Sequence, residues 1–177
     1  MGSTRGIETG VCMFAYNNEE IDYANLAIIA ALHVKANMKH NKVALICDQG
    51  TAGHIEWKFD KKLIDTAFDY IIIDNIESPF RNTRVHHDSP WHTFTAPFKN
   101  QNKHLILDYS PFDKTLLIDT DYLIGNANLD AVFDLDAPLQ MYNSATNLEF
   151  KDPHPDEIQL QHNGVDMWWS TVIYFDK

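Results

Sequence analysis

Two aspartates one residue apart, in Asp119-Thr120-Asp121, directly follow the apolar run Thr115–Ile118. That run predicts a buried strand, and alternate residues of an extended chain point to the same side. Two carboxylates held this close repel each other unless one is protonated or a cation lies between them. Carboxylate oxygens are hard ligands, which suit magnesium, manganese or calcium. The pair therefore predicts a divalent cation site whose open positions could accept phosphate oxygens.

The same spacing occurs once more, in Asp134-Leu135-Asp136. In an aspartate-rich chain of this length, chance alone should produce such a pair roughly twice. The second copy precedes Ala137-Pro138, and this composition is typical of an exposed turn. Only the first copy ends a buried strand, so its position indicates a function more than its spacing does. The alternative for the first copy is an ordinary surface loop.

The net charge limits the partners that the chain can bind. The chain carries 14 Lys and Arg residues against 25 Asp and Glu residues, a formal net charge of −11. A field of this sign repels nucleic acid, which disfavours a protein that binds a phosphate backbone. It would also repel a diphosphate, unless a bound cation locally reversed the sign of the charge that the diphosphate meets.

Apolar periodicity predicts the elements that must position the pair. A helix begins near Asp22 or Asn18, either of which can cap it, carries apolar residues at helical spacing from Leu26 to Val34, and ends within 37–41. A further helix is predicted at 57–68 and helical structure at 103–109, whereas 78–102 reads as loop with a short helix. Strands are predicted at 10–16, 42–47, 70–73, 115–118, 139–142 and 171–175.

Alternating strands and helices with nearly continuous Val/Ile/Leu strands predict an α/β domain, with a largely parallel sheet covered on both faces. We expect a flexible leader at residues 1–9 and a single domain at 10–177. Ligands of such sheets bind beyond the carboxyl ends of the strands. In this sequence the polar residues at those ends are Asn17, Asp48, Asp74 and Asp119.

Two further features bear on location. No apolar run is long enough for a membrane span, and no secretory signal pattern opens the chain. Cys12 and Cys47 each lie inside an apolar strand-like run. They predict reduced core thiols, and together these features favour a cytoplasmic protein.

The segment TLLIDTDYLIGNANLDAVF (Thr115–Phe133) resembles nucleotide-sugar glycosyltransferases of the GT-A fold, most closely the glycogenin-like branch and related bacteriophage-encoded transferases. FAYNNEEIDYANLA (Phe14–Ala27) is similar to the opening segment of that family. The resemblance covers most of the chain. It implies a three-layer α/β/α architecture with a mostly parallel, Rossmann-like sheet. The implied enzyme is a hexosyltransferase that retains anomeric configuration and uses a nucleotide-diphospho-sugar, with UDP as the expected nucleotide.

The resemblance also implies the roles of particular residues. Asp119-Thr120-Asp121 would be the metal and diphosphate motif, in which Asp119 and Asp121 ligate Mn²⁺ or Mg²⁺. Lys103, sixteen positions before Asp119, would lie near the phosphates or the sugar. The residues implicated in contacts to the nucleoside are Tyr16, Asn17, Asn18 and Tyr23.

Other polar residues have both a functional and a structural interpretation. Asp48 could accept hydrogen bonds from uracil or ribose, or it could simply belong to a turn. Arg81 and Arg84 could clamp phosphate oxygens or form surface ion pairs. The histidines at 86, 87 and 92 lack a regularly spaced cysteine or carboxylate partner, which disfavours zinc. Trp168-Trp169 could form an acceptor-side wall or belong to the core.

The sequence departs from the family pattern near its end. Trp168-Trp169-Ser170-Thr171 stands where the family has Phe-Asn-Ser-Gly, and the chain ends at Lys177. An Asp-Gln pair and a histidine that complete the family's donor and metal sites are therefore not assignable. The chain could be a C-terminally truncated fragment or a minimal form, or a partner could supply the rest. No residue identifies itself as a general base or nucleophile.

Three alternative functions stay open. A nucleotidyltransferase on the same fold normally has a Gly-rich, basic loop after the first strand, whereas Tyr16–Glu20 is acidic and lacks glycine. A phosphohydrolase of the haloacid-dehalogenase type carries its aspartate pair at the first strand. A non-catalytic sugar- or nucleotide-binding domain is the third. The acceptor (a glycan, a protein or a small molecule) and the oligomeric state are undetermined.

Overall fold

The computed structural model describes residues 7–75, 82–86, 94–98, 100–142 and 169–177. Its strands are β1 (Thr9–Ala15), β2 (Val43–Cys47), β3 (Tyr70–Ile73), β4 (Asn82–His86), β5 (Phe94–Phe98), β6 (Lys114–Ile118), β7 (Leu139–Tyr142) and β8 (Trp169–Asp176). Its α-helices are α1 (Tyr23–Asn37), α2 (Gln49–Lys58), α3 (Lys61–Ala67) and α4 (Ile106–Tyr109), and its 3-10 helices are η1 (Asn100–Leu105) and η2 (Ala127–Asp134).

The main sheet has six strands in the order β3-β2-β1-β6-β8-β7. Neighbouring strands from β3 to β6 pair in parallel, whereas β8 is antiparallel to both β6 and β7. This arrangement confirms the predicted α/β fold with a mostly parallel sheet. Because β1, β2, β3 and β6 run in one direction, their carboxyl ends share one edge of the sheet.

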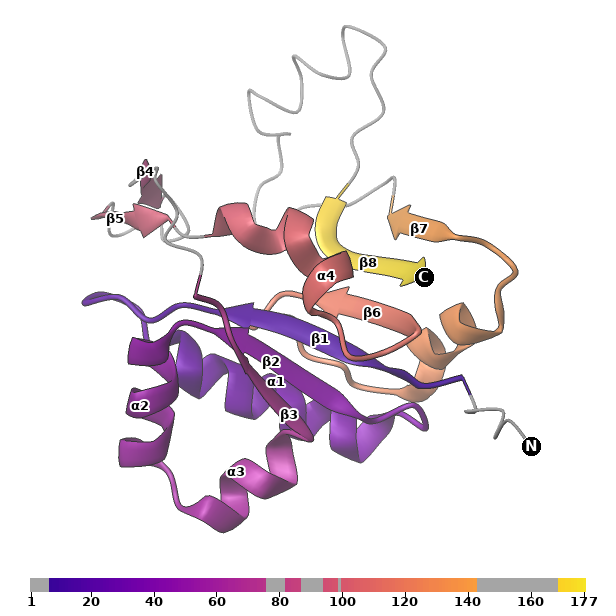
Figure 1. Cartoon of the computed structure of the whole chain (residues 1–177), viewed down its shortest axis with the longest axis horizontal. Helices are drawn as coiled ribbons and strands as arrows, with labels where there is room; N and C mark the ends of the chain where they lie inside the picture. The colour runs from indigo at the N-terminus through magenta and orange to yellow at the C-terminus, as the bar shows by residue number, and fades with distance from the viewer. Residues whose placement is uncertain (1–6, 76–81, 87–93, 99, 143–168) are drawn as a thin grey trace, which may run out of the picture.

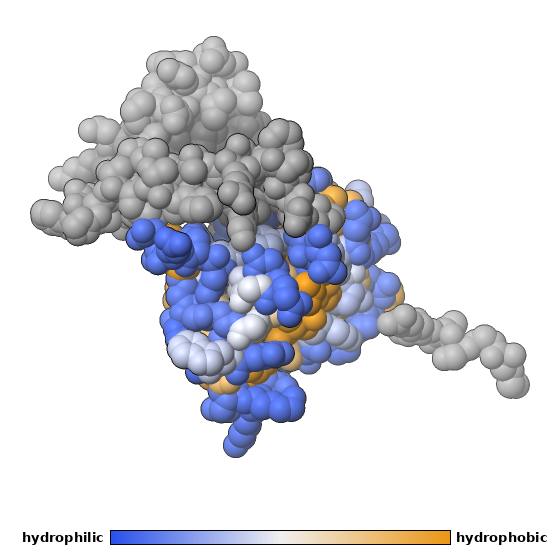
Figure 2. Space-filling model, turned by 60° about the vertical axis from the view of Figure 1, so that its left-hand side comes forward, coloured by the Kyte–Doolittle hydropathy of each residue, from blue (hydrophilic) through white to orange (hydrophobic). Residues whose placement is uncertain are grey.

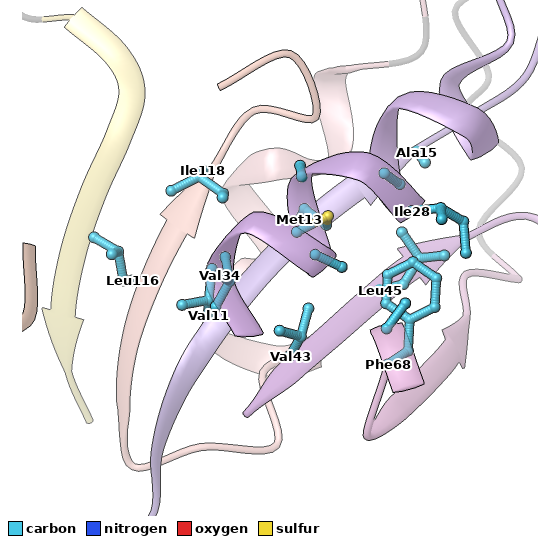
Figure 3. Close-up of a cluster of buried hydrophobic side chains, with 14 of the residues drawn as sticks. Val11, Met13, Ala15, Ile28, Val34, Val43, Leu45, Phe68, Leu116 and Ile118 are labelled. Atoms are coloured by element: carbon cyan, nitrogen blue, oxygen red, sulfur yellow. The ribbon is translucent and has the colours of Figure 1, made fainter. Parts of the chain in front are cut away.

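Helices cover the sheet on both faces, as Figure 1 shows, with α1, α2 and α3 on one side and α4 on the other. Alternate residues of β1 separate into two cores. Val11 and Met13 pack with α1, α2, α3 and η2, whereas Cys12 and Phe14 pack with Ile106 of α4 and with Phe112. Figure 3 shows the first core, where side chains of β1, β2 and β6 gather beneath α1.

The buried face of α1 consists mainly of alanines rather than of the larger apolar residues that periodicity indicates. Ala24, Ala27, Ala30 and Ala31 are fully buried, whereas Ile29 is 39% exposed. Ala30 and Val34 of the predicted apolar face are buried, and the small alanine side chains allow the helix to approach the sheet closely. Asp22 caps the helix by accepting a hydrogen bond from Asn25 N, as predicted.

The predicted helix at 57–68 is wrong in its bounds, because two shorter helices occupy this part of the chain. The helical structure is interrupted at Phe59 and Asp60. The Asp60 side chain caps α3 by accepting a hydrogen bond from Leu63 N. A capping side chain stabilises a new helix start because it satisfies an amide that has no partner within the helix. The break therefore follows from a local cap that the apolar pattern does not reveal.

The prediction of mostly loop at 78–102 is wrong for β4 and β5, which form a separate antiparallel pair with Thr83 opposite Pro97. Proline cannot donate to a sheet ladder and is confined to edge strands. Both strands of a two-stranded sheet are edges, so Pro97 is tolerated there. A proline-containing run of this kind carries no clear strand signal in the sequence.

On the face in Figure 2, hydrophilic residues predominate around a smaller hydrophobic area. Within the described ranges, no helix combines the length and apolar character that crossing a membrane requires.

Candidate functional site

Four strand ends bring polar residues to the carboxyl edge of the sheet. Ala15 of β1 lies opposite Cys47 of β2, and Cys47 lies opposite Ile73 of β3. These positions immediately precede Tyr16, Asp48 and Asp74. Ile118 ends β6, the neighbour of β1 on its other side, and Asp119 follows it. The sheet therefore assembles the edge that the sequence predicts.

The aspartate pair occupies a turn instead of an extended segment. Strand β6 ends at Ile118, and the backbone N–H of Tyr122 donates a 3.1 Å hydrogen bond to the carbonyl of Asp119. Thr120 is buried, Asp119 is half-buried and Asp121 is exposed. The extended geometry that we expected for Asp119 and Asp121 is therefore wrong, because the strand stops one residue before the pair and the chain turns there.

Asp119 forms an ion pair with Lys103, whose Nζ contacts Asp119 Oδ1. The side chain of Lys103 is 18% exposed and that of Asp119 is 26% exposed, so water screens the pair only partly. Lys103 belongs to η1, which leads into α4. The structure thus places Lys103 in direct contact with the aspartate motif, and its position near the phosphates or the sugar stays a prediction.

The two aspartates match a hard divalent ion in the chemistry of their donor atoms. Magnesium commonly takes only one or two carboxylates and fills its remaining positions with water and substrate phosphate. Among the residues that the structure describes, no group of three or more His, Cys, Asp or Glu side chains could hold a metal ion. The residues present therefore fit an ion that draws further ligands from solvent or substrate, provided that Lys103 leaves Asp119.

The Tyr16 side chain is buried and lies beside Asp74. Its hydroxyl donates a 2.6 Å hydrogen bond to Asp74 Oδ2, and the Tyr109 hydroxyl donates one of 2.6 Å to Asp74 Oδ1. Burial, together with the hydrogen bond to Asp74, raises the pKa of Tyr109 to about 12. The sequence identified Asp74 as a polar residue at a strand end but did not reveal these two hydrogen bonds, because Tyr16 and Tyr109 lie 58 and 35 residues away from it.

Asn17 and Asn18 use their side chains to shape the loop between β1 and α1. Asn17 Oδ1 accepts a 2.7 Å hydrogen bond from Ala24 N, and Asn18 Oδ1 accepts one of 2.7 Å from Ile21 N. The backbone N–H of Asn17 also donates to Thr51 Oγ1 at 2.8 Å. These bonds hold the loop against the start of α2.

A pocket of about 490 Å³ opens beside this loop. Its lining residues are Asn17, Asn18, Glu19, Glu20, Ile21, Asp22, Gly50 and His54, so neither Asp119 nor Asp121 contributes to it. Lys58 and His54 contact the Asp22 carboxylate. Burial alone would raise the pKa of Asp22, but the hydrogen bonds from Lys58, Asn25, Asn17 and His54 outweigh it and lower this pKa to about 2.

The remaining predicted site residues lie in several places. The Asp48 side chain caps α2 by accepting a 2.8 Å hydrogen bond from Thr51 N, and Tyr23 opens α1 and packs against the core. Arg84 and His86 belong to β4. Arg81, His87, His92 and Trp168 lie outside the described residues.

Both cysteines are core residues, as predicted. Cys12 and Cys47 are free and fully buried. Burial raises the pKa of each thiol to about 12. A thiol with so high a pKa is neither a nucleophile nor a metal ligand near neutral pH.

Solved glycosyltransferase structures share this architecture. The glycosyltransferase GlyE of Streptococcus pneumoniae TIGR4 matches 97% of this chain at 18% identity with a TM-score of 0.54. The bifunctional glycosyltransferase WbbM matches 99% at 12% identity and 0.56. The galactosyltransferase LgtC, solved in complex with donor and acceptor sugar analogues, matches 94% at 14% identity and 0.57. No protein-family model and no curated protein sequence matches the chain.

Each match covers nearly all of this chain but a smaller share of the glycosyltransferase to which it is compared. This chain spans about a third of GlyE and WbbM, 34% and 32% respectively, and 57% of LgtC. At identities this low, the structural matches establish only a shared architecture. The glycogenin-like branch therefore stays a prediction. The chain therefore has the α/β fold of GT-A glycosyltransferases, over a length that corresponds to part of each of them.

Proposed function

We propose that this chain is the donor-binding part of a metal-dependent glycosyltransferase that uses a nucleotide-diphospho-sugar, with UDP as the expected nucleotide. The observation that carries the proposal is the acidic turn Asp119–Asp121 at the carboxyl end of β6. It lies at the sheet edge where α/β proteins bind ligands, in a fold shared with glycosyltransferases.

The proposed roles follow from charge and position. A divalent ion, Mn²⁺ or Mg²⁺, held by Asp119 and Asp121 would stabilise the negative charge that develops on the departing diphosphate. Lys103 adjoins this turn and would donate to a phosphate oxygen. Asp48, at the end of β2, would face the nucleoside. Arg81 and Arg84 remain proposed phosphate contacts.

The nucleotidyltransferase alternative is disfavoured by the loop after β1. A triphosphate site there needs backbone amides and positive charge. Glu19 and Glu20 are exposed at that position and line the pocket, and their charge would repel a triphosphate. A non-catalytic binding domain is the second candidate, because the chain spans only part of the similar glycosyltransferases.

Isothermal titration with UDP, with and without MnCl₂, tests the proposal. We expect UDP to bind only in the presence of Mn²⁺. We also expect Asp121→Asn to weaken that binding about tenfold or more, because it removes one of two anionic ligands. Asp136→Asn is a matched control, since Asp136 is exposed in the second copy of the same spacing. UDP binding that is absent from the wild-type chain or independent of metal would refute the proposal.

Incubation with UDP-sugars separates an enzyme from a binding domain. Sugar released from a UDP-sugar, detected by mass spectrometry and lost in Asp121→Asn, would show that this length of chain carries out the chemistry. Metal-dependent UDP binding without sugar release would favour the non-catalytic candidate.

A further inference from the structure

We propose that Lys103 is an internal counter-ion that competes with the divalent cation for Asp119, so that the metal binds by displacing it. This inference rests on the proposed function, because it concerns how the same acidic turn is loaded. It begins from the ion pair between Lys103 Nζ and Asp119 Oδ1, which connects η1 to the end of β6.

Electrostatics disfavours the presence of both cations at Asp119. A divalent ion bound to this carboxylate would lie within a few ångströms of the ammonium group. Like charges so close repel strongly in a partly screened environment. With both side chains largely shielded from water, at 18% and 26% exposure, screening does not remove that repulsion. We therefore expect binding of the metal to break the ion pair.

The lysine can leave without unfolding its surroundings. Its charge is carried on a flexible four-carbon stem, and Nζ has no hydrogen-bond partner other than Asp119 among the bonds found for the described residues. Once displaced, the ammonium needs a new anionic partner. A diphosphate placed next to the metal would supply one, since its oxygens accept hydrogen bonds from lysine.

The exchange couples metal and nucleotide. Without nucleotide, metal binding leaves Lys103 unpaired and is disfavoured, whereas with a diphosphate present both cations are neutralised. Each ligand should therefore strengthen binding of the other by the same factor. Lys103 would add to the coupling that direct contact between the metal and the diphosphate already produces.

The test measures Mn²⁺ affinity in the absence of nucleotide, by electron paramagnetic resonance of free Mn²⁺. We expect Lys103→Met to bind Mn²⁺ about tenfold more tightly than the wild type, because a competing unit charge is removed. Lys103→Arg keeps the charge and should bind Mn²⁺ as weakly as the wild type. In the presence of Mn²⁺, Lys103→Met should bind UDP more weakly, so the two affinities change in opposite directions.

Lys35→Met is the matched control. Lys35 forms an ion pair with Asp69, with the two side chains 21% and 35% exposed, but Asp69 immediately precedes β3 at the opposite edge of the sheet. This variant should leave Mn²⁺ affinity unchanged. Circular dichroism of each variant verifies that it is folded.

The outcomes separate this inference from the proposed function. Unchanged or weaker Mn²⁺ binding by folded Lys103→Met would overturn the competition, even if the wild type binds UDP with Mn²⁺. Tighter Mn²⁺ binding by Lys103→Met in a chain that never binds UDP would support the competition and refute the nucleotide-sugar function.

Discussion

Tyr16 and Asp74, which are 58 residues apart in the sequence, are joined by a 2.6 Å hydrogen bond just inside the carboxyl edge of the sheet. Both residues are buried, at 7% and 5% exposure. The bond ties the end of β1 to the end of β3 across β2. It therefore helps to hold the loops that would surround a ligand.

Tyr16→Phe should lower the free energy of unfolding by about 1.5–3 kcal/mol, the usual contribution of a buried hydrogen bond to a charged group. Urea denaturation measures this change. Tyr174→Phe is the matched control, because the buried Tyr174 hydroxyl has no hydrogen-bond partner in the part of the chain that the structure describes. Its removal should leave stability unchanged or raise it. Equal losses in the two variants would contradict the assigned role of Asp74.

Gly10→Ala should destabilise the fold by about 1–3 kcal/mol, the range for overpacking a core. A Cβ at position 10 would lie 2.5 Å from the ring of Phe112, and that ring is 1% exposed, so it has little room to move. Thermal unfolding followed by circular dichroism measures the effect.

Gly53→Ala should change stability in the opposite direction to Gly10→Ala. Nothing lies within 4 Å of a Cβ at position 53, which is in the interior of α2. Alanine there should stabilise the chain by about 0.5–1 kcal/mol through helix propensity. A destabilising effect of Gly53→Ala, or a neutral Gly10→Ala, would contradict the packing described for these strands and helices.

Asp22 should make stability depend on pH in the acidic range. Its pKa in the folded chain is about 2, below the ordinary value of 3.8, so the unfolded chain binds the proton more readily. The stabilisation by Asp22 is therefore complete above about pH 4 and is lost as pH falls towards 2. Melting temperatures of the wild type and Asp22→Asn should differ at pH 7 and converge as the pH approaches 2.

Asp65→Asn is the control for this pH dependence. Asp65 pairs with Lys61 on the exposed surface of α3, at 59% exposure of its side chain, and such pairs contribute little. Its melting temperature should follow that of the wild type throughout. A constant difference between wild type and Asp22→Asn from pH 7 to pH 2 would show that Asp22 acts through something other than its charge.

Neither cysteine should react with a thiol reagent in the folded chain at pH 8. Burial raises the pKa of Cys12 and Cys47 to about 12, which leaves almost no thiolate. Labelling with a chromogenic disulfide should detect both thiols only after denaturation. Rapid labelling of the native chain would contradict the burial of β1 and β2.

Local patterns in the sequence determined much of the architecture. Periodicity correctly predicts the apolar runs of β1, β2, β3 and β6 and the helix that follows β1. It does so because residues on a buried face are apolar and recur at a regular spacing along the sequence. The cap at Asp22 is equally local, since the side chain bonds to an amide three residues away. The acidic pair at the end of β6 was also visible without the fold.

Only the tertiary structure decided what surrounds that pair. The contact of Lys103 with Asp119 and the bonds of Tyr16 and Tyr109 to Asp74 join segments 16 to 58 residues apart. No local pattern encodes such partners, because each contact depends on how distant elements pack together. The turn at Asp119 likewise depends on where β6 stops pairing with β8. Residue types and positions can thus be read along the chain, whereas the partner of each charge is set by packing between distant segments.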